Sequence, residues 1–270
     1  MSRVEEKEFL NMNMMDSPDS QPAPSLRLFT FLVATFEFFG LMSIILTSIW
    51  LGHFQGGFAW DQRLANLEFN YHPLLMILAF VFIHGNANLA YRLLRNEKKI
   101  RVKVIHGGMQ LLAFIFMVIA LRAVFDSHNY ANYDSKTNSY RPIPNLYSLH
   151  SWIGIATIVL YCCQWLTGFL FFFWPKVNLS LRRNYLPVHV FFGVCIHILF
   201  ISTALMGLTE KAIFSIKKPD YSDSPSEGNL VNVLAVVLVL YGLNGVYLLV
   251  NPAFKRQPRP DDDGNYIPRD

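Results

Sequence analysis

Six long apolar runs dominate this chain, and they constrain its fold more than any other feature. Their approximate limits are 28–51, 72–94, 104–125, 149–174, 186–208 and 229–250. Each is close to the roughly twenty residues that a helix needs to cross a hydrocarbon core. With 53% hydrophobic and 16% charged residues, the chain is too apolar for an ordinary soluble domain. The pattern therefore predicts an all-α integral membrane protein with six transmembrane helices.

The basic residues indicate how the helices are oriented. The loops after the second and fourth runs carry a concentration of them: Arg92, Arg95, Lys98, Lys99, Arg101, Lys103, Lys176, Arg182 and Arg183. By the positive-inside rule these loops face the cytoplasm, so both termini are predicted to be cytoplasmic. The formal charge of +4 is spread over tails and loops, which excludes a nucleic-acid-binding footprint.

The two ends of the chain differ in composition from the apolar runs. Residues 1–25 are polar with three prolines, and residues 252–270 are rich in proline and aspartate. Such segments bury too little apolar surface to fold alone. We expect disordered cytoplasmic tails at 1–25 and 252–270 and one transmembrane domain over 26–251.

Four of the eight histidines occupy one kind of position, since His72, His106, His150 and His189 each open an apolar run. Runs two and four enter the membrane from outside and runs three and five from inside. His72 and His150 are therefore expected at one membrane face, and His106 and His189 at the other. Ionisable side chains inside a bilayer are costly, so four matched histidines indicate a function.

Two histidines on opposite sides of a metal require a planar equatorial ligand, which indicates a haem. Glycines supply room for it: Gly154 and Gly193 follow His150 and His189 by four residues, and Gly168 and Gly207 by eighteen, which is five helical turns. Each helix is therefore expected to cradle the haem of the other pair. Zinc is disfavoured, because no tetrahedral ligand set or Glu-bearing helix motif is evident.

Three further polar residues lie within the runs. His84 and His197 point away from the predicted ligand faces and are interpreted as packing or supporting residues, and Glu37 as a partner in an interhelical hydrogen bond. A rival hypothesis is a proton or cation transporter without haem, in which membrane histidines form a relay. A relay needs titratable groups across the centre of the bilayer, whereas the four matched histidines lie near its faces.

Five segments resemble the cytochrome b-561 family in order: YHPLLM, KVIHGG, YSLHSWIG, LPVHVFFG and ALMGLTEKAIF. The resemblance covers about residues 30–250. It implies that helices 2–5 form a four-helix bundle around two haems b. In that family His72 would pair with His150 at the non-cytoplasmic haem, and His106 with His189 at the cytoplasmic haem.

The same resemblance implies transmembrane electron transfer from ascorbate. Basic residues corresponding to Lys99, Lys103 and Arg182 would bind cytoplasmic ascorbate, with Arg92 as a further candidate. On the outer face, monodehydroascorbate or a ferric chelate would be reduced at positions matching Phe125, His128, Asn129, Tyr147 and Ser148. The segment YANYDSKTNSYRPIP between them is longer than is usual in the family. Members occupy secretory-vesicle, endolysosomal or plasma membranes and commonly form homodimers.

Overall fold

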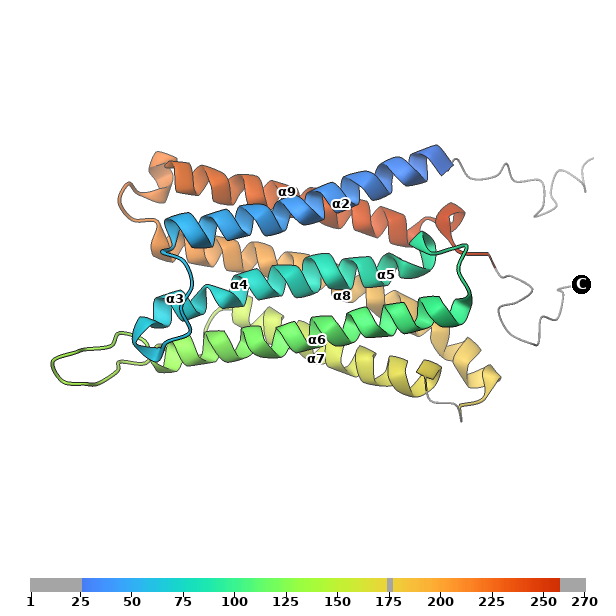
Figure 1. Cartoon of the computed structure of the whole chain (residues 1–270), viewed down its shortest axis with the longest axis horizontal. Coiled ribbons are helices and arrows are strands. Elements are labelled where there is room, and N and C mark those ends of the chain that lie inside the picture. Colours follow the sequence, from blue (N-terminus) through green and yellow to red (C-terminus); the bar gives the residue numbers. More distant parts are fainter. Residues whose placement is uncertain (1–25, 174–176, 258–270) are drawn as a thin grey trace, which may run out of the picture.

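The structure, a computed structural model, describes residues 26–173 and 177–257. It consists of long helices whose axes lie roughly side by side, with the chain running up and down the bundle (Figure 1). Six helical spans are long and apolar enough to cross a membrane: Arg27–Phe54, Gln62–Leu93, Lys99–Asn129, Leu149–Phe173, Leu179–Ser215 and Ser226–Val250. The prediction of an all-α protein with six transmembrane helices is confirmed.

The spans are built from more than one kind of helix. The α-helices are α2 (Leu26–Ile49), α3 (Ala65–Phe69), α4 (Tyr71–Met76), α5 (His84–Leu93), α6 (Lys99–Asn129), α7 (Leu149–Gly168), α8 (Leu179–Ser215) and α9 (Ser226–Val250). Three π-helical segments continue them, namely η2 (Trp50–Phe54), η4 (Ile77–Ile83) and η5 (Phe169–Phe173). Short 3-10 turns are η3 (Gln62–Leu64), η6 (Tyr221–Asp223) and η7 (Pro252–Phe254).

Polar side chains mark several helix starts. Ser148 caps α7 in a capping box with Ser151, and the Asn178 side chain accepts a hydrogen bond from the Leu181 amide at the start of α8. Within the membrane, the hydroxyls of Thr47 and Thr157 donate to carbonyls one turn earlier in their own helices. These bonds leave the hydroxyls satisfied where no water is present.

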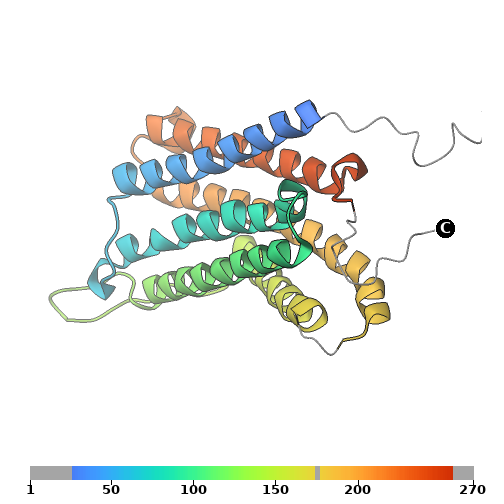
Figure 2. The same ribbon diagram turned by 45° about the vertical axis from the view of Figure 1, so that its right-hand side comes forward.

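Helices α2 and α9 pack together on one flank, whereas α4, α5, α6, α7 and α8 form the rest of the bundle (Figures 1 and 2). Buried apolar residues form two clusters, one mainly between α2, α8 and α9 and the other among η4, α6, α7 and α8. Large apolar side chains elsewhere are exposed, among them Phe31, Trp152, Phe191 and Leu243, each more than 60% exposed. In a membrane protein these surfaces face lipid.

The two ends of the bundle differ. We call the end with the α5–α6 turn and the first turns of α6 and α8 the basic end, because it carries Lys99, Lys103 and Arg182. We call the other end, where residues 130–148 project beyond the helices, the loop end (Figure 1). Of the predicted tails, residues 1–25 and 258–270 lie outside the described residues. The turn η7 still belongs to the packed structure, because Phe254 is 2% exposed and its ring lies 5.2 Å from that of Phe29.

Candidate functional site

His72 on α4 and His150 on α7 face each other near the loop end. Their ring centroids are 6.2 Å apart and their planes are inclined at 79°. Metal–nitrogen bonds of about 2 Å place two opposite imidazole centres roughly 6 Å apart across one ion. The separation therefore suits a single metal ion between the two rings.

His106 on α6 and His189 on α8 make the corresponding pair near the basic end. Their ring centroids are 6.3 Å apart and their planes are inclined at 72°. The structure thus brings together the same two pairs that the sequence suggests. Each pair joins helices that are not consecutive in the chain.

Hydrogen bonds fix the orientation of three of these rings. The Nδ1 atoms of His72, His106 and His150 lie 3.2, 2.7 and 2.9 Å from the carbonyl oxygens of Ala120, Ala87 and Thr203, respectively. Because a carbonyl can only accept, Nδ1 carries the hydrogen and Nε2 is left with its lone pair for a metal. His189 differs, since its Nδ1 is buried without a partner.

Glycines lie against one histidine of each pair. A Cβ atom at Gly207 would lie 2.7 Å from Cε1 of His150, and one at Gly168 would lie 3.0 Å from Cε1 of His189. These two glycines therefore border the histidine of the neighbouring helix, as their spacing predicts. Gly154 and Gly193 lie in less crowded places, because a Cβ there would make only ordinary contacts of 3.4 and 3.8 Å.

Metal sites built only from protein side chains were also considered for residues 26–173 and 177–257. Within those ranges no group of three or more His, Cys, Asp or Glu side chains is placed to hold a metal ion. Two trans imidazoles need further ligands in the plane between them, and a porphyrin supplies four. The residues present therefore fit haem at both pairs.

Comparison with known proteins identifies the family of this chain. The model of the eukaryotic cytochrome b561 family matches residues 71–215, a stretch that contains both pairs. The chain belongs to the cytochrome b561 family. It is 42% identical to the transmembrane ascorbate-dependent reductase CYB561 of Sus scrofa over 90% of each chain. Against the plasma membrane ascorbate-dependent reductase CYBRD1 of Xenopus tropicalis the identity is 42%, over 83% of this chain and 75% of the relative. Family membership implies haem b.

The predicted ascorbate residues lie at the basic end of this cytochrome b561. The Lys103 ammonium donates to the carbonyl of Phe172 at 3.1 Å, and the Phe172 ring lies 5.2 Å from that of His189. Arg182 lies on α8 two turns before His189, and its Nε is buried without a partner. Lys99 lies one turn before Lys103 in the first turn of α6. The three cations thus lie at the same end of the bundle, on the first turns of α6 and α8, and of these Lys103 contacts η5.

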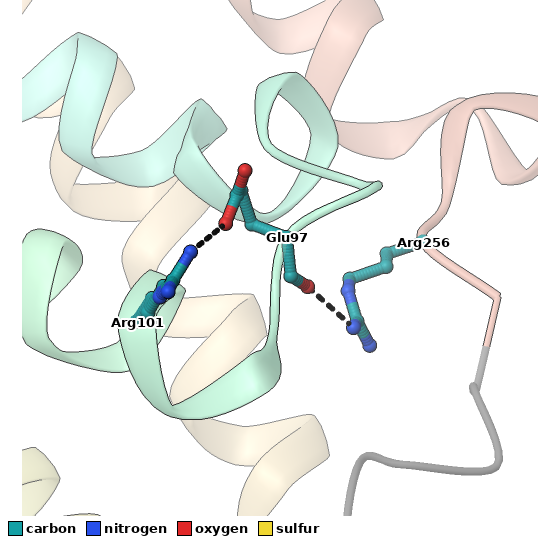
Figure 3. A network of polar contacts seen from close by, with 3 residues as sticks. All are labelled: Glu97, Arg101 and Arg256. Atoms are coloured by element: carbon teal, nitrogen blue, oxygen red, sulfur yellow. Dashed lines mark hydrogen bonds and ion pairs between the residues drawn. The ribbon is translucent and has the colours of Figure 1, made fainter.

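The Arg92 side chain points toward the end of α9. Its guanidinium donates to the carbonyls of Leu249 and Asn251 at the C-terminal end of α9. Nearby, Arg256 donates to the carbonyl of Glu97 at 3.0 Å, while the Glu97 carboxylate pairs with Arg101 at 3.1 Å (Figure 3). These bonds tie the end of α9 to the α5–α6 turn. Arg92 therefore anchors α9, and the ascorbate role considered for it gains no support.

At the loop end, two predicted acceptor residues share a partner. The Asn145 side chain lies 3.0 Å from Nδ1 of His128 and donates to the side chain of Asn129 at 3.1 Å. His128 and Asn129 belong to the last turn of α6, which extends past the expected helix end at 125. Asn145, which sequence reasoning missed, holds them together from the loop.

The other three predicted acceptor residues have separate places. Ser148 is the N-cap of α7 and so sets the position of His150, the second residue of that helix. Tyr147 is 53% exposed at the loop end, and Phe125 is half-buried on α6. A polar cavity of about 450 Å³ also opens at this end, lined by Trp60, Asp61, Gln62, Arg63, Glu68, Arg122, Asp126 and Tyr140. It contains none of the predicted acceptor residues.

Only one of the four matched histidines lies at the start of a transmembrane span. His150 does so, whereas the spans containing His72, His106 and His189 begin at Gln62, Lys99 and Leu179. The helices extend beyond the apolar runs because their end turns carry polar residues suited to the headgroup region. The pairing is unaffected, since depth within the bundle decides it.

Proposed function

We propose that this cytochrome b561 is a transmembrane ascorbate-dependent oxidoreductase with two haems b, one at His72 and His150 and the other at His106 and His189. One observation carries the proposal, namely two histidine pairs of nearly equal separation, 6.2 and 6.3 Å, at opposite ends of one bundle. The relatives CYB561 and CYBRD1 are both named ascorbate-dependent reductases, which supports ascorbate as the electron donor.

The chain's own residues have defined tasks in this proposal. The backbone carbonyls of Ala120, Ala87 and Thr203 orient the imidazoles, and apolar helices exclude water from both pairs. When bound, haem supplies the one-electron chemistry that amino-acid side chains lack.

The donor site lies at the basic end. Ascorbate is an anion near neutral pH, and cations close to the membrane edge raise its local concentration. Lys103 provides that charge beside Phe172, whose ring lies against that of His189, and Lys99 and Arg182 add to it from the first turns of α6 and α8. By the positive-inside rule this end is cytoplasmic, and so are both termini.

The acceptor site lies at the loop end, around the Asn145-linked His128 and Asn129, with Phe125, Tyr147 and Ser148 around it. Monodehydroascorbate or a ferric chelate takes one electron there for each ascorbate oxidised to its radical inside. A secretory-vesicle, endolysosomal or plasma membrane supplies both compartments, and a homodimer is the expected assembly.

The purified protein in ascorbate-loaded vesicles tests the proposal. We expect a Soret band, about two haems per chain, and reduction of external ferricyanide or ferric chelate only when ascorbate is inside. A protein without haem that moves protons would instead support the histidine relay.

A further inference from the structure

Between the two histidine pairs, His84, Asn88 and Gln110 form a closed ring of hydrogen bonds. Nδ1 of His84 lies 3.0 Å from Oε1 of Gln110, and Nδ2 of Asn88 lies 2.9 Å from Nε2 of His84. Nε2 of Gln110 donates to Oδ1 of Asn88 at 3.1 Å. Because an amide oxygen only accepts, Nδ1 of His84 carries the hydrogen and Nε2 accepts from Asn88. The three side chains thus satisfy one another.

A fourth residue locks Gln110 from another helix. The Tyr161 hydroxyl on α7 donates to the backbone carbonyl of Gln110 at 2.6 Å. The side-chain oxygen of Gln110, Oε1, lies 3.3 Å from the same hydroxyl. His84, Gln110 and Tyr161 are 2%, 8% and 2% exposed. Buried polar groups in a hydrocarbon environment are costly, and a fully bonded network specifies one arrangement of its helices. This network fixes α5, α6 and α7 relative to one another.

A local irregularity brings His84 into this network. The π-helical segment η4 ends at Ile83, so His84 is the first residue of α5. One extra residue in a helical turn rotates everything after it by about 100°. The Tyr241 hydroxyl donates to the carbonyl of Val81 inside the π-helical segment, which supplies a partner for a backbone group there.

The network adjoins His106 through the neighbouring residue Ala87. Asn88 follows Ala87, whose carbonyl accepts the 2.7 Å hydrogen bond from Nδ1 of His106. Gln110 lies one turn after His106 on α6. The Asn88–Gln110 bond therefore joins α5 to α6 next to the Ala87–His106 bond. It holds the Ala87 carbonyl and the His106 ring in position relative to each other.

His106 is the anchored member of its pair. Nδ1 of His189 is buried without a partner, so its ring lacks the corresponding hydrogen bond. A hydrogen bond from Nδ1 to a carbonyl raises the basicity of a ligating imidazole, and a more basic axial ligand favours oxidised iron. The geometry of the Ala87–His106 bond is thus a means of tuning the basic-end centre.

We propose that His84, Asn88 and Gln110 are positioning residues for His106, and that they set the reduction potential of the basic-end haem through the Ala87 carbonyl. This inference rests on the two-haem function proposed above. It assigns a role to His84 that its sequence position does not reveal. The network acts on one haem because its connection runs to His106, with none of its bonds reaching His72 or His150.

The test is a potentiometric titration of the haem-loaded protein with the Gln110→Met substitution. Methionine has nearly the volume of glutamine but cannot make these hydrogen bonds. We expect two haems to remain and the midpoint potential of the basic-end component to rise, with a changed low-spin electron paramagnetic resonance signal. The loop-end component should keep its parent potential. Its identity is fixed by its loss in a His150→Ala protein.

Thr157→Val is the matched control. Thr157 is also fully buried on α7, but its hydroxyl donates to Ile153 of its own helix. This variant should leave both potentials at the parent values. An equal shift in it would show that the potential reports general packing, and the proposal would be wrong.

If the Gln110→Met protein does not fold, a second variant provides the test. Tyr161→Phe removes a single hydroxyl from the network and should raise the same potential by a smaller amount. Parent potentials and spectra in a folded network variant overturn the inference while leaving the two-haem function intact. A parent protein that lacks two low-spin haem components would instead overturn the proposed function.

Discussion

The imidazole planes of His72 and His150 are inclined at 79° with their centroids 6.2 Å apart. His106 and His189 repeat this arrangement at 72° and 6.3 Å on the other two helices of the bundle. Three of the four rings take their orientation from backbone carbonyls. The inclination is thus built into helix packing, and it can be measured once iron is bound.

Removing one histidine should remove one haem. In His150→Ala the loop-end pair retains one ligand, and we expect haem content to fall from two per chain to about one. The pyridine haemochrome assay measures this number. His53→Ala is the control, because His53 is an exposed histidine at the end of η2 and should leave two haems. Full haem content in His150→Ala would contradict the pairing.

Gly207→Ala should disturb the loop-end centre without removing a ligand. The new Cβ would lie 2.7 Å from Cε1 and 3.0 Å from Nδ1 of His150, so the ring must shift and its bond to Thr203 must weaken. Loss of a supporting bond of this kind costs roughly tenfold or more in metal affinity. Haem retention during dilution into apomyoglobin measures the effect.

Gly108→Ala is the matched control for that substitution. No heavy atom lies within 4 Å of the place where its Cβ would go. Alanine favours a helix over glycine by up to about 1 kcal/mol, so the control should retain haem and unfold at the same or a higher temperature. If both variants lose haem equally, the close approach of Gly207 to His150 has no influence on the centre.

The sequence predicted the six spans and the two pairs because both depend on local patterns. Hydrocarbon thickness fixes the length of an apolar run, and whole helical turns place Gly168 and Gly207 on the ligand faces. Interactions between distant residues were not predictable in this way. The π-helical segment η4 receives a hydroxyl from Tyr241, which lies 160 residues from Val81 in the chain.

Side-chain partners chosen by tertiary packing explain the remaining differences. Arg92 is one of several cations around the α5–α6 turn, and only the folded chain shows that it reaches Leu249 and Asn251. The depth of His84 in the membrane is compatible with packing, ligand and supporting roles. Its hydrogen bond to Gln110, which the sequence does not reveal, indicates the supporting role. Asn145 lies in an irregular loop where no periodicity indicates a partner for His128.

Arg92→Lys should lower stability and spare ascorbate binding. Lysine cannot reach two carbonyls with a planar fork, so the end of α9 loses at least one charge-assisted hydrogen bond, worth about 2 kcal/mol. We expect a lower thermal unfolding midpoint in detergent with an unchanged KM for ascorbate. Arg101→Lys, at an exposed residue, is the control and should change neither quantity. A raised KM with unchanged stability would return Arg92 to the ascorbate site.

Lys103→Glu should slow reduction by ascorbate. The charge reversal places an anion beside Phe172 and His189, where an anionic donor must approach. We expect KM for ascorbate to rise roughly tenfold, equivalent to about 1.4 kcal/mol, with a weaker effect in high salt. Stopped-flow absorbance measures the rate, and unchanged reduction by dithionite shows that the haems are intact.

Arg101→Glu is the control for Lys103→Glu. It changes the charge by the same amount, and Arg101 also lies near the start of α6. Arg101 is exposed and pairs with Glu97 (Figure 3). Lys103 instead contacts the carbonyl of Phe172. Arg101→Glu should alter the rate much less than Lys103→Glu. Equal losses in the two variants would mean that ascorbate responds to the general surface charge and has no site at Lys103.

His128→Ala should slow electron delivery at the loop end. The imidazole donates from Nδ1 to the Asn145 side chain, which leaves the lone pair of Nε2 available to a hydroxyl group of the acceptor or to a ferric ion. Loss of one hydrogen bond to the acceptor costs about 0.5–1.5 kcal/mol, so we expect an outside-acceptor rate roughly three- to tenfold lower. Both haems and reduction from the basic end should be unaffected.

Asn145→Ala separates orientation of the ring from its presence. Without Asn145, the His128 ring keeps its chemistry but loses the bond that orients it, and Asn129 loses the same partner. An intermediate rate is expected with either ferric chelate or monodehydroascorbate outside ascorbate-loaded vesicles. Lys136→Ala, at an exposed residue in the projecting loop, is the control. If His128→Ala and Lys136→Ala both reduce external acceptors as fast as the parent, acceptors use another part of the loop end, and the polar cavity lined by Glu68 and Asp126 becomes the place to look for it.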